Sequence, residues 1–515
     1  MNVERNYLGR SGRLAALVVA VSMAVAFGTA DAGKGGNGGG GGGGGPTSCA
    51  DLGGTTLDDV RAGVGADTAL ATDGLTGAGI GIAVIDTGVN PTPGLDAPGK
   101  IIDGPDLSFD ALDENLRHRD VHGHGTNMAA IIAADGAPYG GDGVAPGAHI
   151  VNLKVGAGDG AVDVSQVIAA IDWAVANRNV NGANIRVISL AYGTDATQSH
   201  AVDPLSHAVE NAWRHGIVVV AAGGNDGRSI RRLANPAHNP YVLAVGAAER
   251  KSSGWQVPSW SSTGDGVRNP DLVAPGADVV SAAVPGSYLA STHPDATCVA
   301  PDGSIMLRGS GTSQAAAAAA GAVALLLEQR PSLTPDQVKY LLTRNTRNTN
   351  SQNDTQEGWG RLSLYEANKK HNGAAEAATP GIEAVQVHGT SSGLGSLEAA
   401  RGTHHVGDEN DQLTGEVTAY GETWAPLTWA PASSAGTAWS GQIYIDGTWN
   451  GGTWAGASWS GASWSGASWS GASWSGASWS GASWSGASWS GASWSGASWS
   501  GASWSGASWS GASWS

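Results

Sequence analysis

The chain has 515 residues, enough for two or three domains, and its 80 glycines lack the strict triplet period of collagen. Its net charge is −17, from 27 Lys and Arg residues against 44 Asp and Glu residues. Because nucleic-acid binding requires Lys and Arg to neutralise phosphates, this charge argues against nucleic acid as a partner.

Residues 1–32 predict a secretory signal peptide. Arg5, Arg10 and Arg13 form a basic start, residues 14–27 form a short apolar run, and residues 30–32 fit the small-x-small cleavage rule. The apolar run is shorter than the roughly 20 residues of a membrane span, and no other stretch is long enough. We therefore expect a secreted, extracellular protein.

Residues 33–48 predict a flexible tether, since residues 34–45 are almost pure glycine. Too few patterned residues lie between the signal and the next domain to form a folded pro-domain. Just after the tether comes Cys49, and the second cysteine is Cys298. In an oxidising compartment these two can form one disulfide, which would tie the N-terminal arm to the segment ahead of residue 313. Two free thiols are the alternative.

Residues 49–370 predict an α/β domain. Buried apolar runs alternate with helical periodicity, as in the stretch with apolar residues at 164, 167, 168, 171 and 175. The expected strands are residues 80–85, 149–154, 186–190, 217–222 and 241–245. This alternation predicts a parallel β-sheet flanked by helices, with ligands at the carboxyl ends of the strands.

Three short strings carry the chemistry. Asp86 ends a buried strand, His124 begins a helix, and Ser313 lies at the N-terminus of an alanine-rich helix. A serine hydroxyl needs an imidazole to take its proton, and the imidazole needs a carboxylate to fix its tautomer. We therefore predict a catalytic triad in which Asp86 orients, His124 is the general base and then acid, and Ser313 attacks.

The order and context of these strings resemble the subtilisin-like serine peptidases, over about residues 60–368. By this resemblance, Asn225 and the backbone N–H of Ser313 would stabilise the oxyanion. The segment from Ala191 would pair with the substrate backbone, and a pocket lined by Tyr192 would suit an apolar residue before the scissile bond. The substrate-binding residues implied are Ala191, Tyr192, Gly193, Gly223 and Gly224.

The chain also departs from the family pattern. Gln314 follows the nucleophile where Met is usual, and alanines stand at 316 and 317 where Pro is expected. Asn127 replaces a usual His, and Ala191 replaces a common Ser. None of these changes removes a catalytic atom, so we expect activity.

Catalysis of this kind requires no cofactor, and the metal content stays open. The loop from Asp135 to Gly143, with Asp142, lies where the family often binds calcium, but Ala137 stands in place of an amide ligand. A hard cation takes six to eight oxygen ligands, and the sequence does not supply them here. We interpret His122, and the pair at 404–405 followed by acidic residues 408–409, as loop residues rather than ligands.

Residues 371–422 are polar and weakly patterned, and predict a linker. Residues 423–515 form a tail in which tryptophans recur at multiples of five residues, and the pentad Gly-Ala-Ser-Trp-Ser repeats twelve times from Gly456 to Ser515. Since every triad residue lies upstream, we expect truncation after about His371 to leave peptidase activity intact.

The period of five fits neither a straight strand nor an α-helix, because neither places every tryptophan on one face. A square β-solenoid, with four pentads in each 20-residue coil, makes all pentads equivalent and resembles the pentapeptide repeat. A disordered linker is the second interpretation. The third is a surface on which exposed tryptophans bind sugars or cell-wall polymers at the cell surface.

The sequence thus predicts a secreted serine endopeptidase that cleaves proteins or peptides through an acyl-enzyme. Two rivals stand beside it. One is a maturation protease with a single partner, and the other is an adhesion protein whose peptidase domain is vestigial.

Overall fold

The computed structural model describes residues 47–67, 73–111, 113, 115–138, 140–179, 182–364, 367, 380–407, 412–440 and 453–456, and short strands between 463 and 514. The predicted signal peptide and most of the tether lie outside these residues. None of the described helices is long and apolar enough to cross a membrane.

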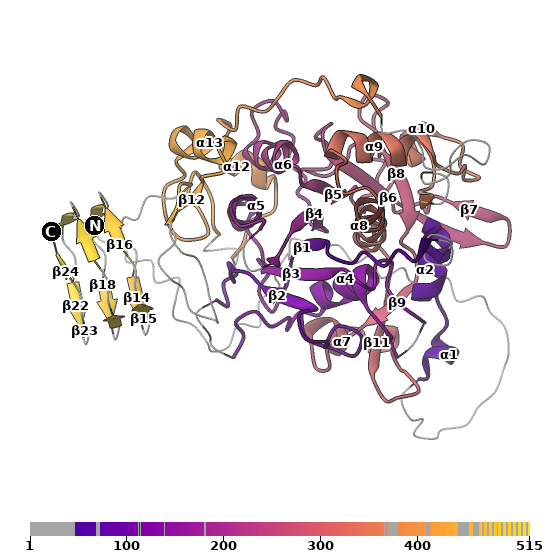
Figure 1. Cartoon of the computed structure of the whole chain (residues 1–515), viewed down its shortest axis with the longest axis horizontal. Coiled ribbons are helices and arrows are strands. Elements are labelled where there is room, and N and C mark those ends of the chain that lie inside the picture. The colour runs from indigo at the N-terminus through magenta and orange to yellow at the C-terminus, as the bar shows by residue number, and fades with distance from the viewer. Residues whose placement is uncertain are drawn as a thin grey trace.

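Seven parallel strands form the central sheet of the described domain (Figure 1). In sheet order they are β2 (Ile101–Asp103), β3 (His149–Lys154), β1 (Gly81–Asp86), β4 (Ile185–Leu190), β5 (Val218–Ala222), β6 (Leu243–Lys251) and β8 (Leu272–Pro275). A short strand, β7 (Gly254–Gln256), pairs antiparallel with β6. The predicted α/β class is confirmed.

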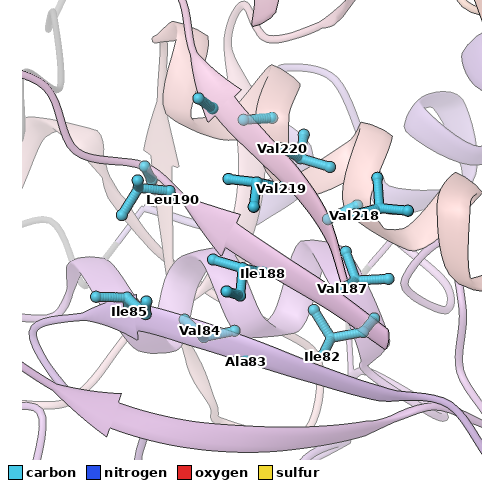
Figure 2. Packing of buried hydrophobic residues seen from close by; sticks show 14 of the residues in the cluster. Ile82, Ala83, Val84, Ile85, Val187, Ile188, Leu190, Val218, Val219 and Val220 are labelled. Carbon is cyan, nitrogen blue, oxygen red and sulfur yellow. The ribbon is translucent and has the colours of Figure 1, made fainter. Parts of the chain in front are cut away.

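The central strands are mostly apolar because helices cover both faces of the sheet. Every residue of β1 is buried, and Figure 2 shows its aliphatic side chains beside those of β4 and β5. On one face lie α4 (His124–Ala133) and α8 (Thr312–Gln329), and on the other α5 (Val164–Ala176) and α6 (Pro204–Arg214) (Figure 1).

Helix α8 passes close to the chain that follows α4 because residue 321 is glycine. A Cβ at Gly321 would lie 2.6 Å from the Cβ of Val144 and 3.2 Å from the carbonyl oxygen of Ile132. The remaining described helices of the peptidase region are α1 (Cys49–Leu52), α2 (Leu57–Val64), α7 (Tyr288–Thr292), α9 (Pro335–Arg344) and α10 (Asp354–Glu357).

A second, antiparallel sheet contains β10 (Thr297–Val299), β11 (Ile305–Gly309) and β9 (Val279–Ala282). The predicted cysteine pair joins the N-terminal arm to this sheet. The sulfur atoms of Cys49 and Cys298 lie 2.10 Å apart, at disulfide-bonding distance, and the Cα atoms are 4.8 Å apart. Both residues are buried with Val280 and Met306 in a small apolar cluster.

The segment that follows the predicted boundary at residue 370 differs from the expectation of a linker and a separate tail. Its described parts form a 3₁₀ turn (Ile382–Ala384), α12 (Leu397–Arg401), α13 (Pro426–Ser434) and a pair of strands, β12 (Trp439–Ser440) and β13 (Thr453–Trp454). Four tryptophans of this segment belong to the apolar cluster of the central sheet, namely Trp424, Trp429, Trp439 and Trp454.

The C-terminal segment binds helix α5 through the buried carboxylate of Asp172. The indole N–H groups of Trp429 and Trp454 donate to Asp172 at 2.6 and 2.8 Å, and the Ser433 hydroxyl donates to its other oxygen at 2.6 Å. Near the start of α5, Asp163 forms an ion pair of 2.5 Å with Arg401, and both side chains are fully buried. The folded unit therefore extends to residue 456.

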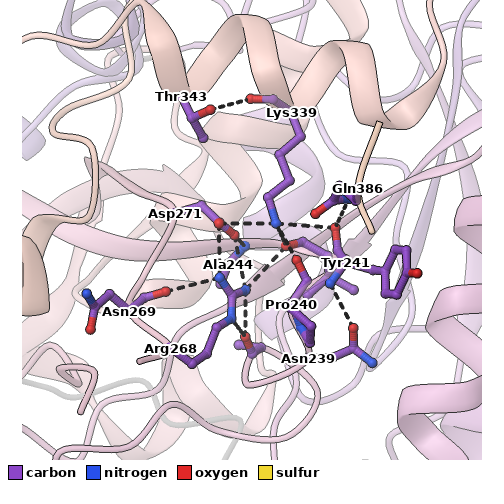
Figure 3. A network of polar contacts seen from close by, with 12 residues as sticks. Asn239, Pro240, Tyr241, Ala244, Arg268, Asn269, Asp271, Lys339, Thr343 and Gln386 are labelled. Atoms are coloured by element: carbon purple, nitrogen blue, oxygen red, sulfur yellow. Dashed lines mark hydrogen bonds and ion pairs between the residues drawn. The ribbon is translucent and has the colours of Figure 1, made fainter. Parts of the chain in front are cut away.

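A polar contact also fixes the start of the segment (Figure 3). Gln386 donates to the carbonyl oxygen of Tyr241 at 3.1 Å, beside a buried network in which Lys339 and Arg268 bind Asp271. Burial lowers the pKa of Lys339 to about 8, although the charge of Asp271 opposes the shift. Removal of the segment would uncover this network, so the expectation that truncation near His371 is harmless does not fit these contacts.

The described strands of the remaining tail follow a regular register. They run from β14 (Ser463–Ser465) to β24 (Ser513–Trp514), one in each pentad, and each strand from β14 to β20 pairs in parallel with the strand 20 residues further on. That spacing equals four pentads and is the one that a 20-residue coil requires. The side chains of the tail lie outside the described residues, so the square solenoid stays a prediction.

Candidate active site

The predicted carboxylate and imidazole meet at the carboxyl edge of the sheet. Asp86 is the last residue of β1, and His124 is the first residue of α4. Nδ1 of His124 lies 2.8 Å from Oδ1 and 3.0 Å from Oδ2 of Asp86, and both side chains are almost completely buried. Since a carboxylate only accepts, Nδ1 carries the proton and donates it to this bond.

Glycine at position 125 permits this close approach. A Cβ there would lie 2.1 Å from the carbonyl oxygen of Gly88 and 3.1 Å from Oδ1 of Asp86. Any larger side chain would push the start of α4 away from β1, and the imidazole would move with it. The Gly-His-Gly string is thus required by packing as well as by chemistry.

A second buried acid, Asp120, was not predicted from the sequence. Its carboxylate accepts the N–H groups of Gly123 at 2.6 Å and Thr126 at 2.7 Å, and the hydroxyl of Thr87 at 2.8 Å. It therefore satisfies free N–H groups at the first turn of α4. The available signal was an Asp a few residues ahead of a predicted helix start.

These charges set the state of the imidazole. Burial alone would lower the pKa of His124, but the negative charges of Asp86 and Asp120 outweigh burial and raise the pKa above 6.5. Nε2 of His124 is buried and makes no hydrogen bond to any described residue. This nitrogen is the lone-pair acceptor that a general base needs.

Ser313 lies in the first turn of α8, and its side chain is 2% exposed. Its hydroxyl contacts the carbonyl oxygen of Ala191 at 3.4 Å. The hydroxyl thus lies at the helix N-terminus, where backbone N–H groups point outward and favour negative charge.

Asn225, the predicted oxyanion residue, follows β5 and is held by the residue ahead of the nucleophile. Its amide oxygen accepts the N–H of Thr312 at 2.9 Å and the Thr312 hydroxyl at 3.1 Å, and the same hydroxyl oxygen accepts the N–H of Gly224. Because Thr312 donates twice to the amide oxygen, it fixes which end of the amide carries the NH₂ group. Sequence reasoning did not single out Thr312.

The predicted substrate-binding segments lie side by side next to Ser313. A Cβ at Gly193 would lie 2.7 Å from the Cβ of Ala234, and one at Gly224 would lie 3.4 Å from it. Gly223 accepts a backbone hydrogen bond from Ala234 at 3.0 Å. These segments therefore converge on Ala234, which the sequence analysis did not name.

Tyr192 differs from the other predicted substrate-binding residues. Its side chain is 3% exposed and belongs to the apolar core, and burial raises the pKa of its hydroxyl well above 10. The ring is therefore inside the domain, and the expectation that it lines an open pocket is not met by its side chain.

One departure from the family pattern, Asn127, and one predicted loop residue, His122, have structural explanations. Asn127 donates to the carbonyl oxygens of Ala282 and Leu307 at 3.1 and 3.3 Å, so it ties α4 to the antiparallel sheet. His122 stacks on Tyr288 with ring centroids 5.4 Å apart. Burial lowers the pKa of His122, although Asp120 opposes the shift, and this favours a neutral packing residue.

In the loop considered for calcium, the carboxylate of Asp142 has other partners. Oδ1 of Asp142 accepts the N–H of Gly136 at 2.7 Å, and Oδ2 lies 3.3 Å from the guanidinium of Arg61. The charges of Asp135 and Asp142 also act on the buried ammonium of Lys100, whose pKa burial lowers to about 8. Asp142 is thus paired with a side-chain cation, and a second cation lies in the field of both acids.

Within the described residues, the histidines at 404–405 are not part of a metal-binding cluster. His405 binds Glu398 at 2.9 Å, and residues 408–409 lie outside the described part of the chain. No cluster of three or more His, Cys, Asp or Glu residues within the described ranges is arranged to hold a metal ion.

The fold places the Asp86–His124 pair at the carboxyl edge of a parallel α/β sheet and Ser313 in the first turn of α8. Residues 77–360, more than half of the chain, match the Subtilase family of peptidases. The chain therefore belongs to the subtilase family.

Individual relatives agree with this assignment. Serine protease AprX of Bacillus subtilis is 36% identical over 284 residues, which cover 53% of this chain and 62% of AprX. Subtilisin BL of Lederbergia lenta is 32% identical over 280 residues, covering 54% of this chain and 88% of that protein. The chain spans less than two thirds of AprX and 40% of the minor extracellular protease Epr of B. subtilis.

Among solved structures, fervidolysin from Fervidobacterium pennivorans, a keratinolytic enzyme related to subtilisin, is 28% identical with a TM-score of 0.47. The match covers 57% of this chain and 43% of fervidolysin.

Proposed function

We propose that the chain is a secreted serine endopeptidase that hydrolyses peptide bonds in proteins through an acyl-enzyme intermediate. The observation that carries the proposal is the buried His124 imidazole, held by Asp86 through Nδ1 with Nε2 left as a base. Membership of the subtilase family supports the same reaction class. Protein or peptide substrates follow from it.

In the first half-reaction, Nε2 of His124 takes the proton of the Ser313 hydroxyl as its oxygen attacks the scissile carbonyl. Asp86 stabilises the imidazolium that forms. The amide of Asn225 and the N–H of Ser313 stabilise the oxyanion, and each such donor contributes about 3 kcal/mol to the transition state. Collapse of the intermediate releases the amine, which receives the proton from His124.

In the second half-reaction, water attacks the acyl-enzyme, and His124 again takes and returns the proton. Asp120 does not touch the reacting atoms. We assign it a positioning role, because it holds the first turn of α4 and its charge favours the imidazolium.

Secretion is part of the proposal. It is supported by the basic start, the short apolar run and the small-x-small site of residues 1–32. N-terminal sequencing of protein from the culture medium should begin at residue 33. Association of the tail with the cell surface or a polysaccharide remains a separate proposal, which binding of the full chain to cell-wall fractions tests.

A fluorophosphonate probe tests the reaction class most simply. It should label Ser313 in the full chain, and Ser313→Ala should abolish both labelling and hydrolysis of casein. Ser310→Ala is the matched control, because this nearby hydroxyl accepts a hydrogen bond from the N–H of Asp278 and should have no catalytic part. Full activity of Ser313→Ala would contradict the proposal.

The same experiment separates the rivals. A vestigial domain on an adhesion protein would not label at all. A maturation protease would label but leave casein intact, whereas a degradative enzyme would digest it.

A further inference from the structure

The C-terminal segment contacts residues 191–194, which begin with the predicted substrate-binding residues 191–193 and are called here the substrate wall. The wall segment that begins at Ala191 continues into Thr194, which pairs with Asn235 by two backbone hydrogen bonds of 2.9 Å. The buried hydroxyl of Thr194 donates to the carbonyl oxygen of Ala400 in α12 at 2.8 Å. Helix α12 therefore contacts the segment whose first residue, Ala191, accepts a hydrogen bond from the Ser313 hydroxyl.

The turn after α12 binds Asp195, the residue that directly follows the wall in the chain. The N–H and the hydroxyl of Thr403 donate to its two carboxylate oxygens at 2.7 and 2.6 Å. Gly402 makes room for this contact, because a Cβ there would lie 2.0 Å from Oδ1 of Asp195. Gly402 also has a φ of +67°, which glycine adopts without strain.

The other side of Asp195 is held as well. Its carbonyl oxygen accepts a hydrogen bond of 2.7 Å from Arg232, which lies between Asn225 and Asn235 in the chain. Partial burial would raise the pKa of Asp195, but the two hydrogen bonds from Thr403 and the charges of His404 and Arg232 lower it. The carboxylate of Asp195 is thus ionised at neutral pH, and the residue is held through both its carboxylate and its main-chain carbonyl.

We propose that Thr403 is a positioning residue for substrate selection, which acts through Asp195 on the wall from Ala191 to Thr194. This inference rests on the proposed peptidase function. The wall and Asp195 are held in place by hydrogen bonds from residues 400–403, which lie about 200 residues further along the chain. Loss of the contact between Thr403 and Asp195 should make the wall more mobile. This should weaken the binding of substrates with a large side chain before the scissile bond.

The test compares Thr403→Val, which loses the hydroxyl donor, with Thr403→Ser, which keeps it. Thr437→Val is the matched control, since this exposed threonine donates only to Ala432 within the same segment. The substrates are chromogenic peptides that differ only in the residue before the scissile bond, either Phe or Ala.

For Thr403→Val we expect KM for the Phe peptide to rise about 3- to 10-fold, as for the loss of one solvent-accessible hydrogen bond of ordinary strength. The value of kcat and the rate of fluorophosphonate labelling should stay within about twofold. Thr403→Ser and Thr437→Val should behave as the unmodified chain. Asp195→Ala should reproduce the effect, and the double variant should add little to it.

An unchanged ratio of KM for the Phe and Ala peptides in Thr403→Val would overturn the proposal. Equal changes in the Val and Ser variants, with a higher KM, a lower kcat and a lower melting temperature in both, would also overturn it, because they would mark a purely structural role. Peptide affinity measured by calorimetry in a Ser313→Ala background gives the same comparison without turnover. Failure of the unmodified chain to label would contradict the peptidase function and leave this binding comparison able to decide the role of Thr403.

Discussion

The carboxyl edge of the sheet and the α5–α6 face each bury a carboxylate, and the two differ in their donors. Asp86 binds the imidazole of His124, a group that can gain a proton during a reaction. Asp172 binds the indoles of Trp429 and Trp454 and the hydroxyl of Ser433, which stay neutral. Burial of a carboxylate therefore does not by itself mark a catalytic site.

The two sites also differ in the electrostatic effect of burial. Beside Asp86, carboxylate charges raise the pKa of the imidazole against burial. At Asp172, burial raises the pKa of the acid although three neutral donors oppose the shift. The first arrangement prepares a base, and the second joins the C-terminal segment to the domain. We infer that the folded peptidase unit consists of both regions.

The largest effect on turnover is expected from Asp86→Asn. The amide keeps the size of the side chain but favours the wrong tautomer of His124, so kcat should fall about 10,000-fold. Steady-state kinetics on a chromogenic peptide measures the loss. Asp172→Asn is the control at the other carboxylate, and an equal fall in kcat there would break the distinction between the two sites.

Asn225→Ala should have the next largest effect. Loss of one oxyanion donor should lower kcat about 100- to 1,000-fold, while KM changes little because the donor acts on the transition state. The same peptide assay gives both constants. A change that falls mainly on KM would make Asn225 a substrate-binding residue instead.

The pH profile should report the imidazole at the catalytic edge. Only the neutral form of His124 can act as a base, so kcat/KM should fall about tenfold per pH unit below its pKa, which lies above 6.5. Since this pKa is raised in the folded state, its contribution to stability is present below pH 6.5 and lost as pH rises through the folded value. An acid limb centred below 6.5 would contradict the assigned charges.

Asp172→Ala should leave turnover unchanged within about twofold and affect stability alone. It removes the acceptor of three buried donors, which should lower the free energy of unfolding by about 3 kcal/mol. Ser433→Ala, which removes one of these donors, should cost about 1 kcal/mol. Denaturant unfolding measures both, and no loss in Asp172→Ala would mean that this contact does not hold the segment.

Much of the catalytic edge could be predicted because its chemistry dictates residue types at fixed places. A strand ending in Asp86, a helix beginning at His124 and a helix N-terminus at Ser313 each combine a periodic pattern with a reactive group. Parallel strands bring such ends together. The supporting residues Asp120 and Thr312 were missed because capping and amide orientation depend on three-dimensional contacts.

The C-terminal segment could not be predicted in the same way. Its polar stretches gave no periodicity, and the tryptophans at multiples of five residues resembled the start of the repeat. What decides their place is the partner, since Asp172 lies more than 250 residues before Trp429 and Trp454. A single sequence carries no signal for a pairing of that kind.

Truncation tests the claim that the folded unit includes residues 380–456 most directly. Four buried tryptophans at about 3–5 kcal/mol each together contribute about 12–20 kcal/mol, at least as much as the free energy of unfolding of most domains, about 5–15 kcal/mol. A chain ending at residue 456 should therefore label with fluorophosphonate at the rate of the full chain and melt at the same temperature. A chain ending at residue 379 should lose both labelling and the cooperative transition. Equal labelling and equal melting temperature in the two truncated chains would contradict the account.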